Sequence, residues 1–175
     1  MSDFKCKKLS ERIIFNKNNF KDYFSYEDYL YKWYSKNILN HEHCFLGKKI
    51  HERQEGFENR KEKSFYHLIC KNSNGKFDRV LTDFNRSSRI KWSIELPKLL
   101  NCNENCTGCS GLKYWIKKYR KKNRHMMMFS ELKYIVILDE EKDKFLLVTA
   151  YYLDKEHRRI SLKNEYNDYL KKTKS

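Results

Sequence analysis

The chain has 175 residues and a formal net charge of +15, from 38 Lys and Arg against 23 Asp and Glu. This length suffices for one domain with a hydrophobic core. The sequence contains no run of about 18 apolar residues that would predict a membrane span. The excess of positive charge favours a polyanionic partner such as nucleic acid. The alternative reading is a lysine-rich proteome in which basic residues are frequent everywhere.

The N-terminus predicts a cytosolic protein, which bears on the state of the cysteines. The first residues lack the apolar stretch of a signal peptide. The six cysteines are then expected to be thiols or metal ligands rather than disulfides. We see no internal repeat and no domain boundary. We therefore expect a single domain over 1–175, in which 1–45 form an N-terminal helical extension and 46–172 form the core.

The first third of the chain predicts one helix and one extended segment. Residues 20–34 carry aromatic side chains at roughly helical spacing, which predicts an amphipathic helix with an aromatic face. Such a face usually packs in a core or on a partner, although aromatic rings also stack on RNA bases. Residues 44–50 predict a short extended run that ends at His51. The charged residues 53–63 predict a loop or a polar helix.

The middle of the chain predicts a hairpin followed by a helix. Residues 65–70 predict a compact strand, and an Asn/Ser/Gly turn separates them from a returning strand over 77–82. A helix is expected to begin near Asp83 or Asn85, because both residue types are good N-caps. Pro97 is expected to end or kink that helix.

The C-terminal half predicts a second helix, three strands and a closing helix. Apolar residues at helical spacing predict an amphipathic helix over 112–119, with lysines on its solvated side. The apolar run 126–129 predicts a strand. Residues 134–138 and 144–153 predict an antiparallel hairpin around a polar turn. Residues 161–172 predict a helix that closes the fold.

Histidine and arginine side chains gather between residues 51 and 92. Histidine transfers protons near neutral pH, and arginine binds phosphate. In metal-independent RNA cleavage, a base activates the 2′-OH, an acid protonates the leaving oxygen and cations stabilise the phosphorane. Taken singly, each histidine is more often structural, but the cluster meets these needs together. Its basic and imidazole side chains are His51, Arg53, His67, Arg79, Arg86, Arg89 and Lys91.

Two further features extend this cluster. On the predicted helix, Arg86 and Arg89 lie one turn apart, where they would hold a phosphate together. In the strand that ends at Tyr152, alternation places Thr149 and Tyr151 on one face, where a hydroxyl and a phenol would join a cleft. Thr and Tyr are also ordinary strand residues. The sequence has no Walker motif, Gly-rich phosphate loop, nucleophile elbow or His-Glu-x-x-His motif.

A cysteine pattern is conspicuous at Cys102, Cys106 and Cys109. Its spacing matches the cluster-binding motif of radical SAM enzymes, but the chain lacks the run of parallel strands that such a barrel needs. A structural zinc site is the more credible metal reading, because three thiolates need one more ligand. Three free thiols in a surface loop are the alternative. The candidates for a fourth zinc ligand are Cys44, Cys70, His41 and His43.

Several of these segments resemble phage- and plasmid-borne domains of the barnase–EndoU–colicin E5/D–RelE (BECR) superfamily of nucleases. The resemblance runs from about His51 to Tyr169. It implies an α+β fold, with helices packed on a small antiparallel sheet, and metal-independent RNA cleavage by a toxin or an effector of conflict between phages. The segments that carry it are His51-x-Arg53, Phe65-Tyr66-His67-Leu68-Ile69, Arg89-Ile90-x-Trp92 and Leu147-Val148-Thr149-Ala150-Tyr151-Tyr152.

The motif match implies that six residues line the cleft, namely His51, Arg53, His67, Arg89, Thr149 and Tyr151. Residues 1–45 and the cysteine loop lie outside the pattern. We therefore expect a cytoplasmic endoribonuclease that requires no cofactor, with His51 or His67 as general base and the other as acid. Its expected partners are RNA and an antitoxin or another phage or host protein.

Three alternatives stay open beside this expectation. The first is a protein that binds nucleic acid through the same basic surface without cleaving it. The second is an inhibitor of a phage or host protein that uses the aromatic helix over 20–34. The third is a zinc-stabilised DNA-binding protein.

Overall fold

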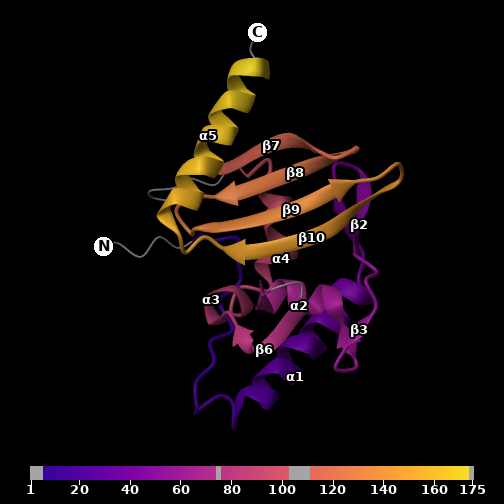
Figure 1. Ribbon diagram of the computed structural model, residues 1–175, viewed down its shortest axis with the longest axis vertical. Helices are drawn as coiled ribbons and strands as arrows, with labels where there is room; N and C mark the ends of the chain where they lie inside the picture. The colour runs from indigo at the N-terminus through magenta and orange to yellow at the C-terminus, as the bar shows by residue number, and fades with distance from the viewer. Residues whose placement is uncertain (1–5, 74–75, 103–110, 174–175) are drawn as a thin grey trace.

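A computed structural model describes residues 6–73, 76–102 and 111–173, with side chains described throughout these ranges except at 72–81. One six-stranded sheet forms the middle layer (Figure 1), with strand order β1-β2-β10-β9-β8-β7. Neighbouring strands run antiparallel except β2 and β10, which are parallel. The strands are β1 (His43–Phe45), β2 (Lys48–Glu52), β7 (Leu112–Tyr119), β8 (Lys122–Phe129), β9 (Tyr134–Glu140) and β10 (Lys144–Tyr152).

Helices cover both faces of this sheet. The long helix α5 (Glu156–Thr173) packs on one face and extends beyond the sheet, and the remaining helices form a layer on the other face (Figure 1). That layer contains α1 (Tyr23–Tyr34), η1 (Ser35–Leu39), α2 (Lys63–Ile69), α3 (Phe84–Ser87), α4 (Trp92–Glu95) and η2 (Leu96–Leu99). Two small hairpins complete the described fold, β3 (Phe57–Glu58) with β4 (Lys61–Glu62) and β5 (Cys70–Ser73) with β6 (Lys76–Thr82). The architecture is therefore α+β, as the sequence predicts.

Alternation along the central strands explains why they are apolar at nearly every position. Met127 and Val136 pack in the cluster under the helical layer, whereas Met126 and Ile135 pack in the cluster under α5. Successive side chains of a strand point to opposite faces. A strand that is covered on both faces therefore needs apolar residues on both, as in the run 126–129.

Residues that precede β2 belong to the same hydrophobic core. Leu9, Ile13 and Ile38 are buried in one cluster with side chains from α2 and β9. Tyr26 is fully buried, and its hydroxyl donates to the carbonyl of Ile13 at 3.0 Å. β1 also joins the central sheet as an edge strand. The segment before residue 46 thus contributes both to the core and to the sheet.

Several predicted elements are confirmed. The structure has a helix within 20–34, a strand over 126–129, a hairpin formed by 134–138 and 144–153, and a closing helix over 161–172, which are α1, β8, β9 with β10, and α5.

The strand predicted over residues 65–70 is wrong, because this segment forms α2 and the strand β5 begins only at Cys70. Phe65, Leu68 and Ile69 are all buried. A short apolar run that is buried on all sides has no periodicity that separates helix from strand. The returning strand of the hairpin is confirmed as β6, which pairs with β5.

The helix predicted over 112–119 is also wrong, because this segment is the edge strand β7. Trp115 is buried under α5, whereas Lys117 and Lys118 lie on the more open part of the strand. Lysines are common on edge strands, where they discourage pairing with other chains. In the sequence, the lysines of such an edge strand look like the charged side of an amphipathic helix, which explains the wrong prediction.

The single helix predicted from Asp83 to Pro97 is divided into α3, α4 and η2. Asp83 is the N-cap of α3 as predicted, and its carboxylate accepts from the backbone N–H groups of Asn85 and Arg86. α3 ends at Ser87, however, so Arg86 and Arg89 do not lie on one face of one helix. The helix geometry that was expected to let both arginines bind one phosphate is therefore absent.

Candidate functional site

The last turn of α2 carries His67, whose imidazole contacts an acidic side chain. His67 Nε2 lies 2.6 Å from Glu55 Oε2, and Arg53 Nη2 lies 3.0 Å from Glu55 Oε1. The side chain of His67 is 25% exposed, that of Glu55 24% and that of Arg53 38%, so a ligand can reach all three. Arg53 and Glu55 follow β2, whereas His67 comes from α2. Tertiary structure therefore assembles this group, which we call the His67–Glu55–Arg53 group.

Two predicted residues hold the turn on which His67 sits. Thr149 Oγ1 donates to the carbonyl of His67 at 3.2 Å. Arg86 Nη1 donates to the carbonyl of Cys70 at 2.6 Å and lies 3.3 Å from the carbonyl of His67. The last carbonyls of a helix lack partners within it, and a cation is favourable at that negative end. Thr149 and Arg86 therefore position the end of α2.

A β-bulge explains how Thr149 reaches α2. The register of β10 against β9 shifts between Leu147 and Thr149, which inserts one extra residue. The pairing of β10 with β2 ends at Leu147, and α2 lies against β10. Bulges redirect side chains and are frequent beside functional sites. Tyr151 lies farther along the same strand, and its ring centroid is 5.2 Å from the guanidinium carbon of Arg86.

Burial lowers the pKa of His67 below its ordinary value, and the nearby charges of Arg53 and Arg86 lower it further. The Glu55 carboxylate acts in the opposite direction but does not outweigh these effects. Because the ordinary histidine pKa is about 6.5, the His67 imidazole is mainly neutral at neutral pH. A neutral imidazole can accept a proton, which is the state that a general base requires.

The opposing effects on His67 can be tested by changing its two neighbours. We expect Glu55→Gln to lower the pKa of His67 further, because the imidazolium loses its favourable interaction with the Glu55 carboxylate. We expect Arg53→Gln to raise that pKa, because a repulsive cation is removed. The measurement is an NMR titration of the His67 ring proton in both variants and in the unchanged protein. A pKa that rises in Glu55→Gln would contradict the arrangement.

Arg89 is placed deeper in the fold than a phosphate ligand requires. It is 7% exposed, and its Nη1 donates to the carbonyl of Asn85 at 2.6 Å. Its guanidinium carbon lies 4.5 Å from the ring centroid of Tyr152 and 5.2 Å from that of Trp92. Burial lowers its pKa from the ordinary arginine value. Arg89 is thus packed between aromatic rings, and Arg53 is the more accessible cation near His67.

The other predicted cluster residues have different surroundings. His51 lies on β2 opposite Leu146, and its exposed side chain acts electrostatically on Glu42. Lys91 is the half-buried N-cap residue of α4. Arg79 belongs to β6, but its side chain lies outside the described residues. Of the predicted set, the structure brings together His67, Arg53, Arg86, Thr149 and Tyr151.

The zinc prediction falls mostly outside the described residues, which include Cys102 but neither Cys106 nor Cys109. Cys102 is exposed, and burial raises the pKa of Cys70 to about 11, which keeps that side chain a thiol. Within the described ranges, the structure places no three His, Cys, Asp or Glu side chains where they would hold a metal ion.

Glu55 is the site residue that the sequence analysis missed. It lies in the charged segment 53–63, where an acidic residue is unremarkable. The only local signal is its position two residues after Arg53, in a chain whose positive charges greatly outnumber its negative ones. Its contact with His67 depends on the placement of α2 and is not visible in the sequence.

No helix within the described ranges is long and apolar enough to cross a membrane. In comparisons with known proteins, no family model, no curated protein and no solved structure matches the chain.

Proposed function

We propose that the chain is a metal-independent endoribonuclease of the BECR type that uses the 2′-OH of RNA as its nucleophile. The observation that carries the proposal is the His67–Glu55–Arg53 group, in which an accessible imidazole with a lowered pKa contacts a carboxylate beside a guanidinium group. These are the side chains that proton transfer at a phosphodiester requires, and they need no cofactor.

In the proposed reaction, His67 takes the proton of the 2′-OH, and the 2′ oxygen attacks the adjacent phosphorus. The bond from phosphorus to the 5′ oxygen breaks, a general acid protonates that oxygen, and the product carries a 2′,3′-cyclic phosphate. Glu55 positions the imidazole through its 2.6 Å contact. Arg53 stabilises the phosphorane charge, since a guanidinium has donors enough for Glu55 and a phosphate oxygen. The expected acid His51 lies on β2 outside the His67–Glu55–Arg53 group, so water is the proposed proton donor to the leaving 5′ oxygen.

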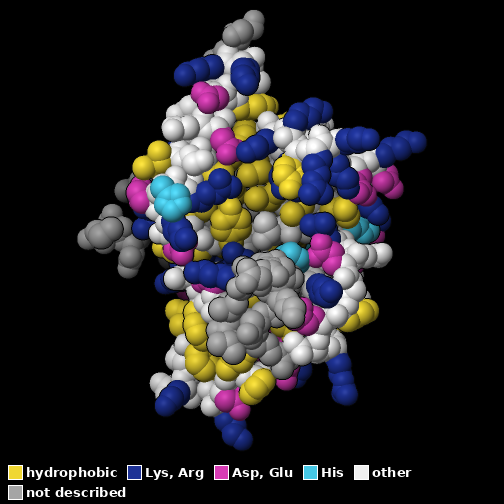
Figure 2. Space-filling model, in the orientation of Figure 1, with side chains coloured by type: hydrophobic (Ala, Val, Ile, Leu, Met, Phe, Trp, Pro, Cys, Tyr) yellow, Lys and Arg dark blue, Asp and Glu magenta, His cyan; other side chains and the backbone are white. Residues whose placement is uncertain are grey.

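The charge distribution supports RNA as the substrate. Lys and Arg side chains gather over the sheet and α5 on the face shown in Figure 2. The whole chain carries a formal net charge of +15, which attracts a polyanion over long distances. We further propose that the enzyme acts in the cytoplasm as a toxin or phage-conflict effector, with an antitoxin or another phage or host protein as its partner.

A cleavage assay in excess chelator tests the proposal. We expect the purified protein to cut a single-stranded RNA in the presence of EDTA and to leave 2′,3′-cyclic phosphate ends. One 2′-deoxy nucleotide placed 5′ of the cut bond should abolish cleavage there, because the nucleophile is missing. Cleavage that requires added magnesium, or that continues past the 2′-deoxy position, would reject this mechanism.

A second candidate function is RNA binding without cleavage. It is favoured by the observation that Glu55 already contacts both Arg53 and His67, while backbone carbonyls occupy Nη1 of Arg86 and of Arg89. Such a protein would bind RNA with a steep dependence on salt and show no turnover. The same purified protein, assayed for binding and for cleavage, distinguishes the two functions.

A further inference from the structure

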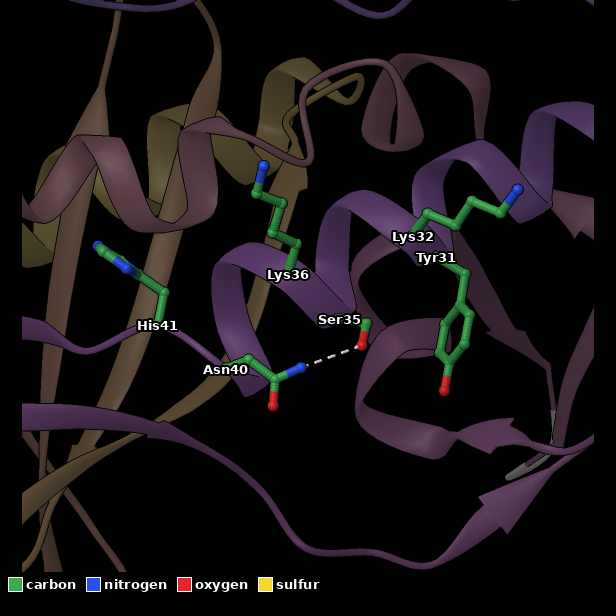
Figure 3. Close-up of a pocket in the computed structure, with 6 residues that line it drawn as sticks. All are labelled: Tyr31, Lys32, Ser35, Lys36, Asn40 and His41. Carbon is green, nitrogen blue, oxygen red and sulfur yellow. Dashed lines mark hydrogen bonds between the residues drawn. The ribbon is translucent and has the colours of Figure 1, made fainter.

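We propose that a hollow beside the end of α1 is a second binding site, which takes a backbone phosphate of RNA. This proposal depends on the proposed function only for the identity of the ligand, which is RNA. The site itself lies on different helices and strands from the His67–Glu55–Arg53 group. The hollow has a volume of about 560 Å³ (Figure 3). It is lined by Tyr31, Lys32, Ser35, Lys36, Asn40 and His41.

A π-helical turn shapes this hollow. α1 continues directly into η1, and the backbone N–H of Asn40 donates to the carbonyl of Ser35 five residues earlier, at 3.0 Å. The Asn40 side-chain amide lies 3.4 Å from Ser35 Oγ, and Figure 3 shows this contact below Lys36, with Asn40 toward His41 and Ser35 toward Tyr31. Single π-helical turns are rare in proteins, but those that occur are often found at functional sites. The turn therefore places an amide and a hydroxyl, both hydrogen-bond donors, beside the lysines.

The positive charges at the hollow are not balanced by its lining, which contains no carboxylate. Lys32 and Lys36 are exposed, and neither forms an ion pair within the described ranges. The acid nearest in sequence to His41 is Glu42, which pairs with Lys49 and also interacts electrostatically with His41. Lysines near a helix C-terminus also interact favourably with the helix dipole. That interaction would explain the lysines but not the hollow beside them.

A pair of histidine rings lies at one end of the hollow. The rings of His41 and His43 lie 4.8 Å apart. Burial lowers the pKa of His43, and the charge of Lys98 lowers it further, so the His43 ring is mainly neutral at neutral pH. The other end is less suited to an anion, because the phenol of Tyr31 interacts with the Glu62 carboxylate. We therefore place the phosphate between Lys36 and His41.

The hollow and the His67–Glu55–Arg53 group are joined by the β3–β4 hairpin. Lys61 Nζ lies 5.3 Å from the ring centroid of Tyr31 on one side. On the other side, the backbone N–H of Lys63 donates to the carbonyl of Gly56 at 2.9 Å, directly after Glu55. Lys61 itself is paired with Glu27 and Asp28 and its side chain is 12% exposed, so the hairpin links the two sites in space but Lys61 adds no free cation between them.

The test compares RNA binding by two charge-matched double variants. The probe is a fluorescent single-stranded 2′-O-methyl RNA of about 20 nucleotides, which cannot be cut and exceeds the usual site of one such surface. The test variant is K32Q/K36Q. The control is K17Q/K21Q, which removes two exposed lysines near the other end of α1. Affinity is measured by fluorescence anisotropy over a range of salt concentrations.

We expect K32Q/K36Q to weaken binding several-fold and to reduce the slope of log affinity against log salt by about 0.7, since the site takes one phosphate and each phosphate contact to a single strand contributes about 0.7. K17Q/K21Q should leave this slope unchanged. Equal losses in the two variants, or no binding of the probe by the unchanged protein, would overturn the proposal.

Inorganic phosphate separates the two sources of the ligand. If phosphate shifts the NMR signals of Asn40 and His41 while K32Q/K36Q binds RNA normally, the site takes free phosphate and the RNA assignment is rejected. Failure of the proposed cleavage reaction has a different signature. In that case the unchanged protein does not cut ordinary RNA, yet K32Q/K36Q still lowers affinity for the uncleavable probe.

Discussion

Replacing His67 with alanine is expected to lower kcat for RNA cleavage by about 10²- to 10⁴-fold, the usual contribution of a general acid or base. The expectation follows from the contact of His67 Nε2 with Glu55 at 2.6 Å and from the lowered pKa of the imidazole. The measurement is the single-turnover rate on a defined RNA in EDTA. His157→Ala is the matched control, because His157 is exposed on α5.

Binding and folding must be separated from catalysis in this experiment. The side chain of His67 is 25% exposed, so its removal should leave the circular dichroism spectrum and the RNA affinity nearly unchanged. Glu55→Gln should give a smaller loss of rate, because this variant keeps the imidazole and changes only its positioning and pKa. A His67→Ala protein that folds and cleaves at the unchanged rate would remove His67 from the proposed mechanism.

Replacing Phe145 with alanine is expected to lower the free energy of unfolding by about 3–5 kcal/mol, the usual cost of removing a buried phenyl ring. Phe145 is 1% exposed on β10. Its ring centroid lies 4.8 Å from that of His125 and 5.2 Å from that of Phe45. The ring therefore joins β10 to β8 and to β1, so its loss leaves a cavity at three strands.

The same substitution at an exposed position provides the control. Phe57 is 70% exposed on the β3–β4 hairpin, so Phe57→Ala should change the free energy of unfolding by no more than about 0.5 kcal/mol. Urea denaturation of both variants measures the two values. Similar losses at Phe145 and Phe57 would show that the sheet does not have the packing described.

Several parts of the fold could be predicted from local patterns. The hairpin of β9 and β10 and the helix α5 are long, and each carries a clear apolar periodicity. α2 and β7 were mispredicted for a common reason. Short segments contain too few residues to establish a period, and their burial is decided by neighbours that are distant in sequence.

The candidate site shows the same division. Its histidine, its arginines and the hydroxyl of Thr149 were identifiable because their side-chain chemistry suits phosphate and proton transfer. Glu55 was not identifiable, because it contacts His67 across twelve positions of the chain and through the placement of α2. The role of Arg86 also differs from the prediction, since its Nη1 holds carbonyls at the end of α2.

Composition and local periodicity predicted the α+β class of the fold, and they identified side chains that are chemically suited to phosphate binding and proton transfer. These properties depend on composition and on local periodicity, which are present in any unfolded chain of the same sequence. Which of these side chains come into contact depends on the tertiary structure. The bulge in β10 turns Thr149 toward α2, and the packing of α2 brings His67 to Glu55. Arg89 is buried between aromatic rings, which leaves Arg53 as the more accessible cation beside His67. Such contacts arise from long-range packing, which local sequence patterns do not encode.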